Sequence, residues 1–150
     1  MKNFFKNNSL YLAWTVALVA MLGSLYFSEI AHYPPCVLCW YQRIAMYPLV
    51  FILGFAIYKK SRDLILPALV LAPLGWIIGI YHNLLYYKIL PEAAAPCIAG
   101  VSCTTKFIEW FGFLTIPLLS FLGFTTIIVL LIFHWKFNQS ADGVNTKENI

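Results

Sequence analysis

Four long apolar runs dominate the chain, and short polar segments separate them. The runs cover about residues 10–28, 40–58, 64–81 and 114–133. A helix of about 20 residues crosses a hydrocarbon core of roughly 30 Å, because each residue contributes about 1.5 Å. The runs are continuously apolar and lack the alternation that a membrane β-barrel requires. The pattern therefore predicts an all-α integral membrane protein built as a four-transmembrane-helix bundle.

The composition agrees with this class. Hydrophobic residues make up 61% of the 150 residues and charged residues 11%, against about 45–50% and 25% in a soluble domain. These values exclude a soluble globule and a disordered chain. We expect a single membrane domain over residues 1–150, surrounded by membrane lipid, with a flexible cytoplasmic tail over about 138–150. The ten Lys and Arg form no basic patch, so nucleic acid is not an expected partner.

The first apolar run follows Lys2 and Lys6, as in a signal peptide. The run is longer than the usual hydrophobic region of about 7–15 residues, and no small-x-small cleavage site follows it. We therefore expect it to be retained as a transmembrane helix.

The basic residues predict the orientation. Seven of them lie in the N-terminal tail, the 59–63 turn and the C-terminal tail, and three lie on the other side: Arg43, Lys88 and Lys106. Because positive residues concentrate on the cytoplasmic side, both termini are expected there. A multi-pass cell-membrane protein follows, with extracytoplasmic loops near residues 29–39 and 82–113.

All four cysteines fall in these two outside loops, which indicates disulfide chemistry. Of three possible pairings, the spacing favours Cys36 with Cys39 and Cys97 with Cys103. A Cys-x-x-Cys ring closes little chain and adds little stability, so it is more often redox-active. Two inert structural disulfides are the alternative. A four-cysteine zinc site fits poorly, because five residues separate Cys97 from Cys103 instead of about two to four, and no metal is expected.

The second helix is expected to begin near Cys39. From residue 44 to 58 a helix would span only about 22 Å, which is too short to cross the membrane. At a helix N-terminus, the dipole and backbone N–H groups would stabilise a Cys39 thiolate. Arg43 lies four residues further on the same face and is a candidate partner of that thiolate. The alternative is an arginine that anchors to lipid headgroups.

Aromatic residues follow the second cysteine pair at helical spacing. Phe107, Trp110 and Phe111 lie beside Lys106 and Glu109. This pattern predicts a short interfacial helix in the second outside loop, which would hold the loop close to the bilayer.

These motifs together resemble the DsbB family of membrane disulfide-forming oxidoreductases, most closely its shorter BdbC-type branch. The strongest part is the segment CVLCWYQR over residues 36–43 at the start of the second helix. The second cysteine pair and the Phe113-Leu114-x-x-Pro117 motif at the start of the last helix agree. One departure is the second pair, which is widely separated in the longer DsbB branch.

The resemblance implies an electron path to a membrane quinone, menaquinone or ubiquinone. A reduced thioredoxin-fold thiol oxidase outside the membrane, DsbA/BdbD-like, would reduce the Cys97–Cys103 disulfide. That pair would then reduce Cys36–Cys39, and Cys39, aided by Arg43, would pass two electrons to the quinone. His82, at the expected end of the third helix, resembles a histidine near the family's quinone site. Its alternative is an interfacial histidine bonded to water or headgroups.

Two other classes compete with this interpretation. A vitamin K epoxide reductase-like enzyme is also a quinone-linked helical bundle, but its Cys-x-x-Cys lies near the start of a late helix, unlike the early pair here. A non-catalytic scaffold would use its disulfides only to brace the loops.

Overall fold

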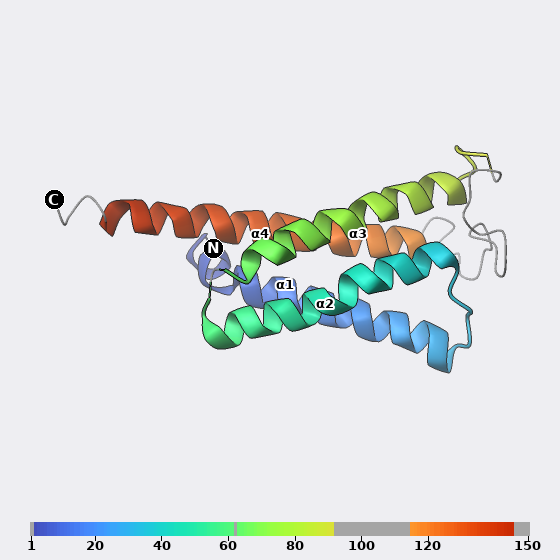
Figure 1. The fold of residues 1–150 in the computed structure, drawn as a ribbon, viewed down its shortest axis with the longest axis horizontal. Helices are drawn as coiled ribbons and strands as arrows, with labels where there is room; N and C mark the ends of the chain where they lie inside the picture. Colours follow the sequence, from blue (N-terminus) through green and yellow to red (C-terminus); the bar gives the residue numbers. More distant parts are fainter. Residues whose placement is uncertain (1, 62, 92–114, 146–150) are drawn as a thin grey trace.

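The computed structural model describes residues 2–61, 63–91 and 115–145. The described residues form four α-helices, and a π-helical turn, η1 (Tyr26–Ile30), continues the first (Figure 1). The helices are α1 (Lys2–Leu25), α2 (Val37–Lys59), α3 (Ile65–Tyr86) and α4 (Ile116–Asn145). Four stretches are long and apolar enough to cross a membrane: Asn8–Ile30, which combines α1 with η1, and Val37–Lys59, Ile65–Tyr86 and Ile116–Lys136 in the other three helices. The all-α four-helix class is confirmed.

All four helices are longer than the apolar runs predict, and α3 and α4 extend furthest beyond their expected C-terminal ends. The hydropathy falls at His82 and Asn83, yet α3 continues to Tyr86 because these polar side chains point into the bundle. Asn83 Nδ2 donates to the carbonyl oxygens of Gly79 at 2.8 Å and of Pro117 at 3.1 Å. Helix α4 continues to Asn145, so the tail expected to be flexible from residue 138 is helical up to that point. The expected interfacial helix lies outside the described residues.

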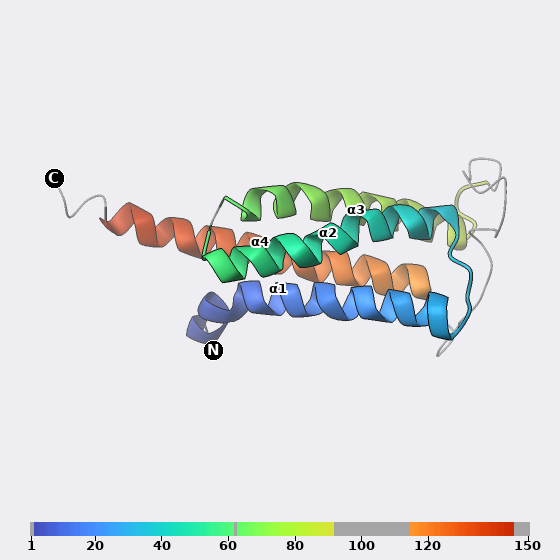
Figure 2. The same ribbon diagram turned by 60° about the horizontal axis from the view of Figure 1, so that its bottom comes forward.

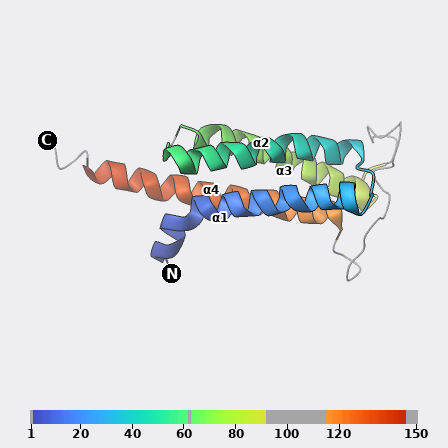
Figure 3. The ribbon, with the colours of Figure 1, turned by 90° about the horizontal axis from the view of Figure 1, so that it is seen from below.

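The helices are arranged as a ring in which α1 packs on α2 and α4, and α3 packs on the same two helices. Figures 2 and 3 show consecutive helices running in opposite directions along the long axis. The start of α1, the end of α4 and the α2–α3 turn lie toward one end of the bundle, and the α1–α2 connection lies at the other. Cysteines 36 and 39 therefore lie at the end opposite to the termini.

The centre of the bundle is apolar, and small residues bring its helices together. Leu49, Leu53, Phe124 and Ile127 are completely buried. A Cβ atom at Gly75 would collide with the Phe124 ring, so the glycine allows α3 and α4 to approach. Other large apolar side chains point outward, as expected for helices that face lipid: Phe51, Phe55, Val70, Ile77 and Val129.

Candidate active site

The first turn of α2 is shaped by the residues just before it. A helix cannot continue back through Pro34 and Pro35, because proline lacks a backbone N–H and disfavours helical geometry in the residue before it. Cys36 is extended, with φ −71° and ψ 170°, and its sulfur accepts a hydrogen bond from the Cys39 N–H at 3.4 Å. Cys36 thus occupies the N-cap position that serine or aspartate often takes. The helix begins at Val37, two residues before the predicted start near Cys39.

The two cysteines form a close, reduced pair. Both are free thiols in this structure, and their sulfur atoms lie 3.1 Å apart. Cys36 is buried and Cys39 is half-buried. Disulfide formation therefore needs only a small side-chain movement, because the separation is already about 1 Å from a bonded one.

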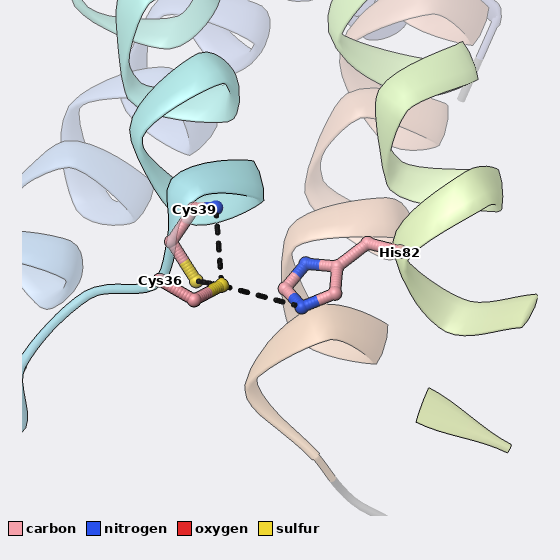
Figure 4. A group of neighbouring side chains, drawn as sticks. All are labelled: Cys36, Cys39 and His82. Carbon is pink, nitrogen blue, oxygen red and sulfur yellow. Dashed lines mark hydrogen bonds between the residues drawn. The ribbon is translucent and has the colours of Figure 1, made fainter. Parts of the chain in front are cut away.

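His82 of α3 joins this pair from across the bundle. Its Nε2 atom lies 3.7 Å from the Cys36 sulfur, and Figure 4 shows the imidazole edge pointing at the thiol. The side chain is only 2% exposed, and its Nδ1 atom has no hydrogen-bond partner within the described part of the chain. His82 was predicted to end the third helix at the interface; it lies instead inside the bundle, one turn before the end of α3.

The contacts of Cys36 favour its thiolate. The pKa of Cys36 is lowered from its ordinary value of 9.0 to about 4, and the side-chain hydrogen bond with Cys39 makes the largest contribution. Burial opposes this change, and the hydrogen bond and charge of His82 together with the Cys39 N–H support it. The sequence predicts the thiolate on Cys39 because it places the helix start there. Since Cys36 is the cap, the geometry favours a thiolate on Cys36.

Arg43 is held between α1 and α2. One terminal nitrogen, Nη2, donates to the Ser24 carbonyl oxygen at 2.9 Å, and the guanidinium carbon lies 5.5 Å from the centre of the Trp40 ring. Its Nε atom is buried and has no partner among the described residues. These contacts hold the arginine one turn below Cys39 and favour a role inside the site over a headgroup anchor.

A cavity of about 570 Å³ opens beside the cysteine pair. It runs between α1, α2 and α4 from Tyr33 and Thr115 down to Thr15 and Thr126, and most of its wall is apolar. This volume lies in the range of small-molecule sites, roughly 300–1,000 Å³. Both cysteines line it, together with four polar side chains whose buried atoms lack partners within the described chain: Gln42 Nε2, Arg43 Nε, Tyr47 Oη and His82 Nδ1.

Gln42 and Tyr47 were not predicted as site residues. Gln42 is 6% exposed and lies three residues after Cys39, on the inner face of α2. The sequence does contain a signal for Gln42, because it is a neutral polar residue within an otherwise apolar span. Burying such a residue in a membrane costs free energy unless it has a function or a partner. Cys97 and Cys103 lie outside the described residues, so the second redox pair stays a prediction.

A membrane bundle with a close Cys-x-x-Cys pair at one end is the arrangement expected of a membrane disulfide-forming oxidoreductase. The comparisons with known proteins agree with this class. Residues 6–134 match the family model described as disulfide bond formation protein DsbB, and the chain belongs to that family.

Several curated relatives are similar over most of the chain. Disulfide bond formation protein C of Bacillus subtilis (strain 168) is 48% identical over 122 residues, 81% of this chain and 88% of the relative. Probable disulfide formation protein C 2 of Bacillus anthracis is 49% identical over 121 residues, which are 80% of this chain and 85% of the relative. Probable disulfide formation protein C of Halalkalibacterium halodurans is 47% identical over 126 residues, which are 83% of this chain and 92% of the relative. No solved structure gives a significant match. The resemblance to the DsbB family and its C-type branch is confirmed, which favours it over the vitamin K epoxide reductase-like and scaffold alternatives.

Proposed function

We propose that this protein reoxidises an extracytoplasmic thioredoxin-fold thiol oxidase and delivers the electrons to a membrane quinone. The cavity beside Cys36 and Cys39 is the observation that carries this proposal. The cysteine pair lies at the wall of this mostly apolar cavity, inside a membrane bundle. A lipid-soluble electron acceptor dissolved in the membrane could therefore reach it.

The residues around the cavity fit a quinone head group. A quinone has two carbonyl oxygens that accept hydrogen bonds, and its ring is apolar. Gln42, Arg43 and His82 supply donor nitrogens that have no partner among the described residues, at the cysteine end of the cavity. Burying such groups without a partner costs roughly 1–3 kcal/mol each, so a ligand that satisfies them recovers this free energy. Gln42, Arg43 and His82 would therefore hold the head group. A bound quinone supplies the acceptor for the two electrons and two protons that a dithiol loses on forming a disulfide.

The chain's own groups prepare the thiols for that oxidation. The N-cap geometry and the Cys39 side chain stabilise the Cys36 thiolate. His82 Nε2, 3.7 Å from the Cys36 sulfur, is placed to take up the thiol proton. Arg43 holds a positive charge one turn below Cys39, and most of the cavity wall beside the pair is apolar.

The second pair supplies the connection to the partner in this proposal. A partner thiolate attacks the Cys97–Cys103 disulfide, and the released thiols then reduce the Cys36–Cys39 disulfide. Each exchange breaks one S–S bond and forms another, so no electrons are lost between the partner and the inner pair.

A reconstituted assay tests this function. We expect purified protein in lipid nanodiscs to oxidise many equivalents of a thioredoxin-fold dithiol when quinone is supplied, with one quinone reduced per dithiol. Without quinone, oxidation should stop once the protein's own disulfides are consumed. The matched control contains dithiol and quinone without the protein. Continued catalysis in the absence of quinone would overturn the assignment of the acceptor.

We also propose that the cysteine end of the bundle faces the outside and both termini face the cytoplasm. The seven-to-three distribution of basic residues supports this orientation. In a cysteine-free background, Glu29→Cys and Lys59→Cys place single exposed thiols at opposite ends of the bundle. A membrane-impermeant maleimide should label Glu29→Cys in intact cells and Lys59→Cys only after permeabilisation. The reverse pattern would exclude the orientation.

A further inference from the structure

We propose that the reduced Cys36–Cys39 pair and His82 form a zinc-binding site that exists only while the pair is reduced. The three ligand atoms, two sulfurs and one imidazole nitrogen, lie within 4.8 Å of one another. They come from the N-cap and first turn of α2 and from α3, and Figure 4 shows the three side chains close together. The cysteine pattern alone does not predict this set, because His82 is 43 residues beyond Cys39 in the chain.

The geometry is close to that of zinc ligands. Two sulfurs bound to one tetrahedral zinc at about 2.3 Å lie roughly 3.8 Å apart, and a sulfur and an imidazole nitrogen lie slightly closer. Here the two sulfurs are 3.1 Å apart, and the Cys36 sulfur is 3.7 Å from His82 Nε2. Side-chain movements of about 1 Å, which small changes of the χ angles provide, would complete the arrangement. Spacing of two residues between cysteine ligands is also common in zinc sites.

The surroundings of the three residues favour a metal ion. Cys36 and His82 are 6% and 2% exposed, so each is held by packing before any ion arrives. Two thiolates neutralise the charge of Zn²⁺, and a neutral complex is easier to bury than separated charges. All three residues line the cavity, which leaves an open side for water as a fourth ligand. Binding releases the protons that the thiols carry and transfers no electrons.

Zinc at this position would hold the pair in its reduced state. The sulfur atoms of a zinc-bound dithiolate are not available to form a disulfide, and oxidation of the pair removes two of the three ligands. Zinc binding itself needs only the reduced pair and His82, and it does not depend on the proposed function. Its consequence, a reversible block of electron delivery, rests on the proposed function.

Direct binding measurements test the site. The Cys97→Ser/Cys103→Ser background removes the other thiols, so any thiolate ligand must come from the inner pair. We expect the reduced protein to bind one Zn²⁺ per chain in competition with a chromophoric chelator, and Co²⁺ to give a thiolate-to-cobalt charge-transfer band. The oxidised protein should bind neither ion at this site. His82→Asn should weaken Zn²⁺ binding on the order of 100-fold, since loss of even an outer partner of a ligand costs about 10–100-fold.

A second histidine provides the matched control. His32 is exposed in the α1–α2 connection and has a φ of 54°, which asparagine tolerates, so His32→Asn should leave Zn²⁺ affinity unchanged. Cys36→Ala removes a ligand from α2 and serves if His82→Asn does not fold. Equal binding by oxidised and reduced protein, or full affinity in both His82→Asn and Cys36→Ala, would overturn the proposal. Zinc binding without quinone-dependent turnover would instead contradict only the proposed function.

Discussion

Replacing Cys39 with alanine is expected to reduce quinone-coupled turnover on the order of 10³-fold or more, as removal of a central catalytic group does. Cys36 then has no sulfur at 3.1 Å with which to form a disulfide. Exchange between the partner and the Cys97–Cys103 pair should continue, because it needs neither inner cysteine. The measurements are steady-state quinone reduction and trapping of the mixed disulfide with the partner.

The same variant has a second readout. The Cys39 side chain makes the largest contribution to the lowered pKa of Cys36, so its removal raises that pKa. The thiolate fraction of Cys36 at a given acidic pH should therefore fall, and the pH profile of its alkylation should shift to higher pH. Cys39→Ser retains a hydrogen-bonding group and should shift the profile less. Quinone reduction at the normal rate in Cys39→Ala would show that the inner pair does not deliver the electrons.

The second large effect concerns Arg43. Arg43→Ala removes a charged hydrogen-bond donor from the cavity. A hydrogen bond from a charged group contributes about 1.5–3 kcal/mol to the free energy of an interaction. We expect the quinone KM to rise roughly 10- to 100-fold, consistent with that free energy. Arg43→Lys should recover part of the loss, because it keeps the charge but lacks the planar, forked donor geometry. The measurement is quinone reduction per mole of inserted protein over a range of quinone concentrations.

Lys59 provides the matched control for Arg43. It is an exposed basic residue at the opposite end of α2, so Lys59→Ala should leave the quinone kinetics unchanged. A headgroup anchor makes a different prediction for Arg43: lysine would substitute fully, and alanine would lower only the amount of inserted protein. Unchanged kinetics in Arg43→Ala would exclude its role at the quinone.

Much of the architecture follows from local sequence. The bilayer sets the length of a span, so four apolar runs are enough to predict four helices and the class of the protein. The Cys-x-x-Cys motif and Arg43 lie within eight consecutive residues, and one helical turn necessarily brings Cys39 and Arg43 to the same face. The resemblance to the DsbB family rests mainly on this segment, and the comparisons confirm it.

Hydropathy did not predict the end of α3 or the start of α2, for an identifiable reason. It reports the polarity of a residue and not whether its polar atoms are satisfied inside the bundle. Asn83 donates to the carbonyl oxygens of Gly79 and Pro117, so α3 continues beyond the end of the apolar run. The start of α2 differs for a similar reason, since the Cys36 sulfur caps the helix in a way that spacing alone does not show.

The sequence by itself indicated the cysteines, Arg43 and His82 as the candidate site residues, because such residues are conspicuous in an apolar chain. Only the tertiary structure decided how they meet. Gly75 has no Cβ atom to collide with the Phe124 ring, and this allows α3 and α4 to pack closely. Packing among all four helices then brings His82 to 3.7 Å from the Cys36 sulfur across 46 residues of chain. It also leaves the cavity beside Gln42 and Tyr47. Such contacts depend on which helix faces meet, and no periodicity within one helix encodes that choice.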